Sequence, residues 1–437
     1  MARINITRKI YSYRSHAIVV ATQRRLLFII GGTGVGAAAV LMALLADHAQ
    51  RLFRDLIDLF PLSALAITPA GFAVSALLAR TVFPNAGGSG IPQVVAARDL
   101  PDPALREQLV SLRGASGKII VMTFGLLCGA STGREGPTVQ VGAAVMHAAG
   151  RLVPERQRGL LLAGGAAGVA AAFNTPLAGI VFGIEELSRA FETRTSGLTL
   201  GAIIAAGLTA LALVGNYTYF GSTGATLPLG RAWLAVPVCA VIGGLAGGLF
   251  SRVVLLVLRD LPARGSALVR YPVLLAALCG LGVALCGFLG HGSVHGTGYE
   301  EARAIIHGTG EIGPDFAPLK FVATVLSSVS GIPGGLFAPS LAVGAGLGAD
   351  LALIFDTIPV GALALIGMVS YLTGVLQAPI TSFVIVSEMT ENHAMIIPLM
   401  VSAVIADATS KLVCREGLYH ALAAPMVARL APRSKTD

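Results

Sequence analysis

The chain has 437 residues, of which 54% are hydrophobic and only 12% are charged. Ordinary soluble domains carry about 25% charged residues, so this composition and a mean hydropathy of +0.77 point to a membrane protein. The 54 glycines and 22 prolines lie inside apolar runs without a collagen period, which excludes collagen-like and low-complexity chains. The five cysteines are scattered without a Cys-x-x-Cys spacing, so neither a disulfide framework nor a metal site is predicted.

The net charge of +8 could suggest a nucleic-acid partner, but its distribution argues for a membrane instead. Residues 1–25 contain six basic side chains and no acidic one. By the positive-inside rule this segment is a cytoplasmic flank. Basic residues also prevail over residues 429–437, which predicts that both termini are cytoplasmic. The 21 uncharged residues from Leu26 to Ala46 are then a membrane span, since they are too many for a signal-peptide core.

The apolar stretches that follow have uneven lengths. They cover residues 61–79, 119–132, 138–150, 159–184, 232–251, 272–290, 321–349 and 357–387. A helix of 13 residues reaches only about 20 Å, whereas the hydrocarbon core of a bilayer is roughly 30 Å thick. Glycines and prolines also interrupt these stretches, which is tolerated at membrane depth only where the backbone lines a cavity. We therefore expect an all-α integral membrane protein of many tilted and re-entrant helices.

An internal repeat accompanies these interruptions. When residues 133–143 are placed over residues 335–345, five of eleven positions are identical. With an offset of 203 residues, Asn174-Thr-Pro-Leu falls on Gln377-Ala-Pro-Ile, and Glu185 falls on Glu388. Transporters often place their site where the discontinuous helices of two repeats meet. We expect two inverted repeats, over 26–215 and 230–430, of which the second includes the C-terminal helix with Tyr419.

Four short segments can each start a helix inside the membrane. They are Gly87–Pro92, Gly133–Pro137, Gly331–Pro339 and Gly417–Tyr419. Glycine allows close backbone approach, and proline in the first helical turn forfeits no hydrogen bond. A helix that starts at mid-membrane directs unpaired N–H groups and the positive end of its dipole into the cavity. The four segments together predict an anion site.

The same segments resemble the CLC family of chloride channels and chloride/proton antiporters. The motifs GSGIP (88–92), GREGP (133–137), GGLFAP (334–339) and a late Tyr419 stand in the family's order and spacing. The likeness covers nearly the whole chain and includes AAAFNTPLAG (170–179) and SEMTEN (387–392). It implies a homodimer with one anion pathway in each subunit. It also indicates a prokaryotic, antiporter-like member without cytoplasmic CBS domains.

The resemblance also implies the ligands of the anion. Chloride is expected to be held by the hydroxyls of Ser89 and Tyr419 and by backbone N–H groups at Leu336, Phe337, Arg134 and Gly136. The side chain of Arg134 is expected to be a structural cation. Neutral donors of modest strength bind the ion without trapping it, as conduction requires.

Two glutamates are the candidate proton carriers. A carboxylate inside a membrane is costly and is therefore a functional candidate. The N–H groups that would bind chloride can also bind the Glu135 carboxylate, so this side chain would compete with the ion. By resemblance Glu135 is the gating glutamate, and Glu186 is the internal proton acceptor that passive channels of the family usually lack. Glu186 could instead mark a helix end that reaches cytoplasmic water.

Four further positions bear on this interpretation. Gln93 stands where many relatives carry Glu, and Val95 stands where some bacterial antiporters carry a second acidic residue, so the resemblance does not define the details of the inner proton route. Lys118 is expected to act on the anion path through its long-range field rather than by contact. Glu388 is expected to be structural and to bond to loop backbone.

We therefore expect a chloride/proton antiporter in the inner (plasma) membrane, in contact with lipids and independent of cofactors and nucleic acids. The alternative is a passive voltage- or proton-gated chloride channel of the same fold. Selectivity for fluoride or nitrate is a second alternative, although Ser89 favours chloride. An enzyme is not expected, because the sequence contains no His-Glu-x-x-His motif and no convincing pairing of a histidine with a nucleophile.

Overall fold

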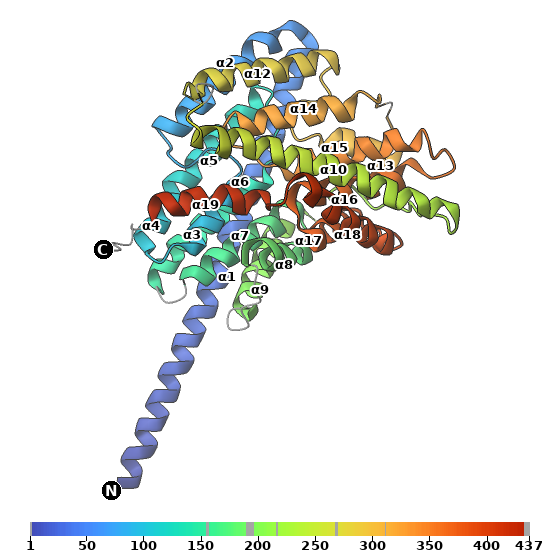
Figure 1. Ribbon diagram of the computed structural model, residues 1–437. Helices are drawn as coiled ribbons and strands as arrows, with labels where there is room; N and C mark the ends of the chain where they lie inside the picture. Colours follow the sequence, from blue (N-terminus) through green and yellow to red (C-terminus); the bar gives the residue numbers. More distant parts are fainter. Residues whose placement is uncertain are drawn as a thin grey trace.

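The computed structural model describes residues 2–153, 157–188, 196–215, 217–266, 270–310 and 312–431. Within these ranges the chain forms helices and no β-strand (Figure 1). The first half forms α1 (Ala2–Leu59), α2 (Ala64–Thr81), α3 (Ile91–Asp99), α4 (Pro103–Leu109), α5 (Leu112–Leu127), α6 (Glu135–Ala149), α7 (Gln157–Phe173), α8 (Pro176–Phe182) and α9 (Ser196–Val214). The second half forms α10 (Ala235–Leu255), α11 (Leu261–Ala263), α12 (Pro272–Leu289), α13 (Tyr299–His307), α14 (Phe316–Val329), α15 (Phe337–Ala352), α16 (Val360–Leu376), α17 (Pro379–Thr390), α18 (Ile396–Val413) and α19 (Leu418–Leu430). Short 3₁₀ or π turns adjoin them at η1 (Pro61–Ser63), η2 (Gly150–Leu152), η4 (Gly183–Ser188), η5 (Arg231–Leu234) and η6 (Leu256–Asp260).

Long and short apolar helices are mixed, as the uneven stretches predicted. Seven helical segments of the described residues are long and apolar enough to cross a membrane. The first of these, Arg25–Leu59, is the second part of α1, and the first part of α1 projects beyond the bundle (Figure 1). The predicted basic flank and the first predicted span are thus one continuous helix. The all-α membrane fold expected from the sequence is confirmed.

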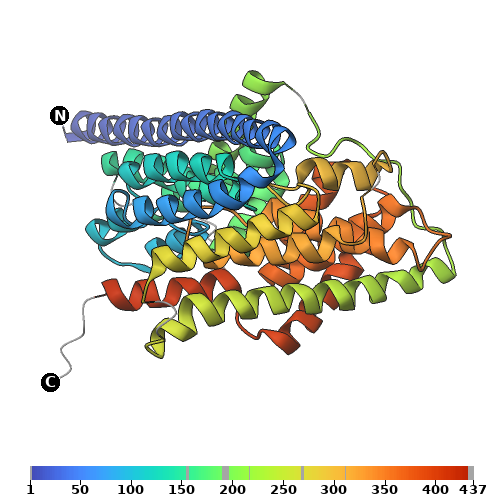
Figure 2. The same cartoon turned by 90° about the horizontal axis from the view of Figure 1, so that it is seen from above.

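The helices of the two halves correspond to one another. α2 and α12 each have 18 residues, α3 and α13 each have 9, and α7 and α16 each have 17. Their packing corresponds as well, because α6 packs on α7 as α15 packs on α16, and α1 packs on α9 as α10 packs on α18 (Figure 2). The halves meet where α2 packs on α12 and α8 packs on α17. The internal repeat predicted from the sequence is therefore present in the fold.

Local sequence explains where several helices begin. Proline occupies the first turn of α3, α8, α12 and α17, where its missing N–H forfeits no hydrogen bond. Gly90 precedes α3 with a φ of 97°, a left-handed conformation that favours glycine. All four segments predicted to start helices do so, at Ile91, Glu135, Phe337 and Leu418.

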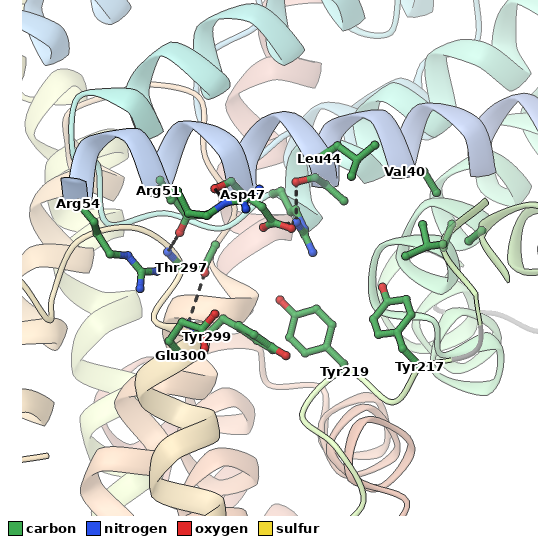
Figure 3. Close-up of a pocket in the computed structure, with 16 residues that line it drawn as sticks. Val40, Leu44, Asp47, Arg51, Arg54, Tyr217, Tyr219, Thr297, Tyr299 and Glu300 are labelled. Carbon is green, nitrogen blue, oxygen red and sulfur yellow. Dashed lines mark hydrogen bonds and ion pairs between the residues drawn. The ribbon is translucent and has the colours of Figure 1, made fainter. Parts of the chain in front are cut away.

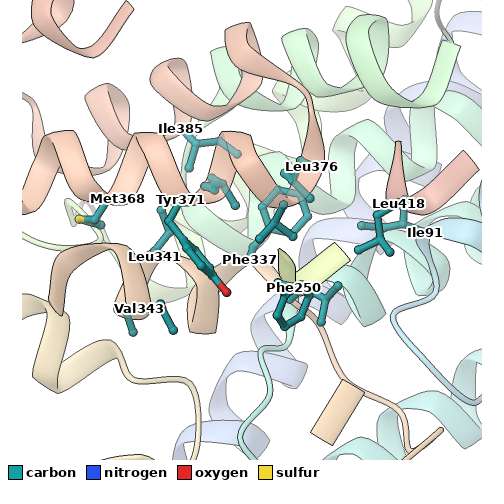
Figure 4. Packing of buried hydrophobic residues seen from close by; sticks show 14 of the residues in the cluster. Ile91, Phe250, Phe337, Leu341, Val343, Met368, Tyr371, Leu376, Ile385 and Leu418 are labelled. Carbon is teal, nitrogen blue, oxygen red and sulfur yellow. The ribbon is translucent and has the colours of Figure 1, made fainter. Parts of the chain in front are cut away.

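Three of these helix starts are anchored in the hydrophobic core. Ile91, Phe337 and Leu418 are fully buried, and Figure 4 shows them in one cluster with residues of α10, α15, α16 and α17. The ring of Phe337 makes edge contacts with Phe173 and Phe182, with centroids 6.0 and 5.8 Å apart. Because protein cores are close-packed, these anchors fix where the helix N-termini point.

Candidate functional site

The loops before α3, α6 and α15 are joined to one another by backbone hydrogen bonds. The N–H of Gly133 donates to the carbonyl of Gly335 at 2.8 Å, and the N–H of Gly335 donates back at 2.7 Å. The loop containing Gly88 is bonded to the same segment, since the N–H of Gly334 donates to the Gly88 carbonyl at 3.2 Å. Segments about two hundred residues apart in sequence thus meet at one point, with three helix N-termini around it.

Glu135 lies at this point as the first residue of α6, and its side chain is fully buried. Its carboxylate is close to its own backbone N–H and to that of Ala338, in the first turn of α15. Neither carboxylate oxygen makes a hydrogen bond of ordinary length and angle within the described residues. Two helix dipoles favour negative charge at this position. The arrangement can hold either the carboxylate or a small anion.

The loop that carries Ser89 packs closely against the start of α6 at Gly136. A Cβ atom added to Gly136 would lie only 2.8 Å from the backbone oxygen of Ser89 and 3.3 Å from the Cα of Gly335. The Ser89 hydroxyl is buried and has no hydrogen-bond partner in the described part of the chain. It is therefore available to donate to a ligand at the start of α6.

Tyr419 places a second hydroxyl near that of Ser89. Its side chain is fully buried at the start of α19, and its hydroxyl lies near that of Ser89. A cavity of about 300 Å³, which we name the Ser89 cavity, includes Ser89, Leu336, Tyr419 and Arg259 in its lining. The predicted hydroxyl donors and the start of α15 therefore share one cavity.

Leu336 and Phe337 stand at the start of α15, as its N-cap and first helical residue. Both side chains are buried in the core. Only the backbone of this pair can present polar groups to the cavity, and the first N–H groups of a helix have no partner within the helix. Any contact of this pair with a bound anion would therefore be made by backbone N–H groups.

A second cavity, of about 410 Å³, lies on the Arg134 side and is shown in Figure 3; we name it the Arg134 cavity. The guanidinium of Arg134 donates to Asp47 at 2.7 Å and to the carbonyl of Ala43 at 2.9 Å, both on α1. These two bonds hold the Arg134 side chain against α1. Tyr217 and Tyr219 face α1 across this cavity (Figure 3).

Glu186 lies in η4, and its side chain is 5% exposed. The Nε2 atom of His420 is 3.7 Å from its carboxylate and 3.0 Å from its backbone oxygen. The alternative of a helix end in open water does not fit this burial. Sequence reasoning missed His420 and Asp47. An acidic residue just after the first apolar run was a usable signal for Asp47, whereas no local signal marked His420.

Lys118 acts more directly than predicted. Its ammonium group is buried and donates to the carbonyls of Gly87 and Gly88 at 3.1 and 2.8 Å. These bonds hold the loop that carries Ser89. Lys320 is its counterpart in the second half and donates at 2.8 Å to the carbonyls of Val294 and Gly296.

Comparisons with known proteins show which family the chain resembles in sequence. The family profile described as "Voltage gated chloride channel" matches residues 70–411. The H(+)/Cl(-) exchange transporter ClcA of Yersinia pseudotuberculosis serotype IB (strain PB1/+) is 32% identical over 404 residues, which cover 84% of this chain and 80% of the relative. ClcA of Yersinia pestis bv. Antiqua (strain Angola) is 32% identical over 403 residues, with the same coverage.

Solved structures share the fold. A slow cyanobacterial Cl⁻/H⁺ antiporter superposes with a TM-score of 0.76 at 24% identity, over 93% of this chain and 97% of its own. A CLC-type fluoride/proton antiporter superposes with a TM-score of 0.74 at 23% identity, over 90% and 96% of the two chains. From the extent of the profile match and the identity to these relatives, the chain belongs to the voltage-gated chloride channel (CLC) family.

Proposed function

We propose that the protein is a chloride/proton antiporter. The observation that carries this proposal is the Glu135 carboxylate, which is buried where α6 and α15 begin and where the N–H groups suit an anion. The relatives named as H(+)/Cl(-) exchange transporters support the choice of ions. Chloride and the ionised Glu135 side chain would exclude each other from the same donors, so movement of one ion is linked to movement of the other.

The anion site in this proposal is made from neutral donors. Its ligands are the hydroxyls of Ser89 and Tyr419 and the backbone N–H groups of Leu336, Phe337, Arg134 and Gly136. The two hydroxyls support this assignment because they are buried close enough to interact with each other, and neither meets hydrogen-bond geometry with a described residue. A buried hydroxyl that lacks a partner is costly, so a bound anion that accepts its hydrogen bond stabilises both groups.

The proton route in this proposal uses Glu135 and Glu186. Glu135 takes a proton when it leaves the anion site, which neutralises the carboxylate and lets chloride occupy the donors. Glu186 exchanges protons with the cytoplasm. The start of α19 supports a link between the anion site and Glu186, because His420, the residue after Tyr419, has its Nε2 atom 3.7 Å from the Glu186 carboxylate.

The membrane placement and assembly complete the proposal. The protein would lie in the inner membrane as a homodimer, with both termini cytoplasmic and with inverted repeats over 26–215 and 230–430 after a cytoplasmic segment over 1–25. The candidate spans support a membrane location, and the basic N-terminal segment supports a cytoplasmic N-terminus. Labelling of single cysteines at each terminus with a membrane-impermeant reagent in intact cells tests the placement of the termini. The mass of the detergent-solubilised protein tests the homodimer.

The experiment that tests the function is proton uptake by proteoliposomes when only a chloride gradient is imposed. An antiporter moves protons against their gradient, and its reversal potential depends on both ions. A passive chloride channel moves no protons, and its reversal potential ignores the pH difference. Absence of coupled proton movement by the reconstituted protein would overturn the proposal in favour of the channel.

A further inference from the structure

Building on the proposed function, we infer that Arg259 forms an entry site for chloride at the mouth of the Ser89 cavity, where chloride and the Glu416 carboxylate compete for its guanidinium group. Arg259 is the only charged residue among the described residues that line this cavity. The rest of the lining is apolar or neutral and includes the hydroxyls of Ser89 and Tyr419. A single cation in the wall of such a cavity raises the local concentration of small anions.

A π turn at the end of α10 directs Arg259 toward the cavity. Val254 and Leu258 line the same wall, as residues four apart on one helix face do. In a regular α-helix Arg259, which is five residues after Val254, would point about 140° away from it. In η6 the N–H of Leu261 donates to the carbonyl of Leu256, five residues earlier, which widens the turn and reduces this angle. Turns of this kind are frequent at functional sites.

Arg259 lies between the buried part of the cavity and water. Tyr419, in the same lining, is fully buried, whereas the Arg259 side chain is 23% exposed. The Glu416 side chain, which pairs with Arg259, is 59% exposed. Exposure therefore rises along the cavity from Tyr419 to Arg259 and on to Glu416, which places Arg259 at the mouth.

Two carboxylates hold the guanidinium group of Arg259. Its Nε atom donates to Asp260 at 2.8 Å, and its Nη1 atom donates to Glu416. A guanidinium group has five N–H donors, and these two bonds leave others for an anion. Asp260 is on the same helical turn and is only 16% exposed, so it stays with Arg259. The pair with the exposed Glu416 contributes little free energy, and an arriving chloride ion can displace this carboxylate.

The loop that carries Glu416 is also held without Arg259. Glu416 is three residues before Tyr419, in the loop that leads into α19. The side-chain amide of Gln377 donates to the carbonyl of Cys414 in this loop, and Leu418 is anchored in the hydrophobic core. Exchange of Glu416 for chloride at Arg259 therefore leaves the Tyr419 hydroxyl in place.

The other cations of this region are outside the cavity. Arg252, Arg264 and Arg415 are exposed, and none of them belongs to the cavity lining. Arg252 is on the same helix as Arg259 and pairs with the same Asp260, at 3.5 Å. It is therefore a matched control, because its removal takes away the same charge without touching the cavity.

The test measures chloride exchange by proteoliposomes over a range of chloride concentrations. Arg259→Gln should raise the half-saturating chloride concentration about tenfold, at the lower end of the range for electrostatic focusing, and should leave the maximal rate near that of the wild type. Arg259→Lys retains the charge and should keep most of the affinity. Arg252→Gln should match the wild type. High ionic strength from a salt that is not transported should reduce the difference between Arg259→Gln and the wild type.

Glu416→Gln distinguishes an entry site from a structural ion pair. Arg259→Gln and Glu416→Gln break the same pair, so a structural role predicts that both raise the half-saturating concentration. Competition predicts opposite changes, because loss of the carboxylate frees the guanidinium group and should lower this concentration. Changes in the same direction, or an Arg259→Gln profile equal to that of the wild type, would overturn the inference.

Proton uptake by the same liposomes tests the proposed function separately. If the wild type moves chloride without protons, the proposed antiport fails, and the chloride profiles still decide the role of Arg259. If the wild type moves no chloride, the proposed function and the inference both fail.

Discussion

Glu185 and Glu388 each cap a helix that belongs to the other half of the chain. The Glu185 carboxylate accepts hydrogen bonds of 3.1 and 2.6 Å from two amides in the first turn of α17. The Glu388 carboxylate accepts hydrogen bonds of 3.1 and 2.8 Å from two amides in the first turn of α8. The relationship is reciprocal, and both glutamates and both capped turns are related by the same offset of 203 residues. A structural role was predicted for Glu388 and is confirmed, and Glu185 has the same role.

Removing the charge from either cap should destabilise the fold without changing the ions that are moved. Glu185→Gln or Glu388→Gln leaves one oxygen to accept and places an amide NH₂ group against backbone donors. Because hydrogen bonds to charged groups contribute about 1.5–3 kcal/mol, each substitution should lower the melting temperature in detergent measurably. Glu107→Gln is the control, since its ion pair with Arg151 is exposed on both sides and contributes little. A shift no larger than that of Glu107→Gln would contradict this reading of the caps.

The sequence predicted the helix starts because they depend on local chemistry. Glycine before proline in the first turn marks the beginning of α3, and the repeat placed the break before α15. It could not predict contacts that depend on long-range packing. His420 meets Glu186 across 234 residues, and Lys118 meets the loop of Ser89 through backbone carbonyls, which no side-chain pattern reveals. These contacts arise only once α19 packs on α3 and α5 lies beside the loop.

Variants of the two candidate proton carriers should differ in whether chloride exchange still depends on external pH. Glu135→Gln and Glu135→Ala should abolish proton uptake while chloride still moves, because a neutral side chain no longer competes for the donors. Glu186→Gln should also abolish proton uptake, but chloride exchange should then keep its dependence on external pH, because Glu135 still titrates. Chloride efflux and proton uptake, recorded together in liposomes, check both expectations. Intact coupled exchange by Glu135→Ala would refute the role of this glutamate.

A single methyl group at the start of α6 should weaken anion binding. In Gly136→Ala the added Cβ would lie 2.8 Å from the Ser89 backbone oxygen, so the loop must move away from the helix. Overpacking of this kind costs about 1–3 kcal/mol, and the displaced hydroxyl no longer meets the anion. We expect chloride affinity, measured by calorimetry, to fall about tenfold, which corresponds to 1.4 kcal/mol.

Gly201→Ala in α9 is the matched control for this substitution. Nothing lies within 4 Å of a Cβ added at Gly201, so the same chemical change meets open space. Alanine in a helix interior is favoured over glycine by about 1 kcal/mol, so this variant should be at least as stable as the wild type. Equal chloride affinity in the two variants would show that Gly136 does not set the approach of Ser89.

Substitutions of the two buried lysines should distinguish effects on stability from effects on chloride binding. Lys118→Met removes two hydrogen bonds to the loop of Ser89, and Lys320→Met removes two hydrogen bonds of similar length to the equivalent loop of the second half. Each variant removes a buried lysine donor from two carbonyls, so both should lower the melting temperature. The decrease should be smaller in Lys118→Met, because the carbonyls of Gly87 and Gly88 still accept hydrogen bonds from Gln93 and Gly334. Only Lys118→Met releases the loop that carries a hydroxyl to the anion. We therefore expect chloride affinity to fall in Lys118→Met and to stay near that of the wild type in Lys320→Met. Equal losses of affinity in both variants would mean that general loosening of the fold, and not the position of Ser89, controls chloride binding.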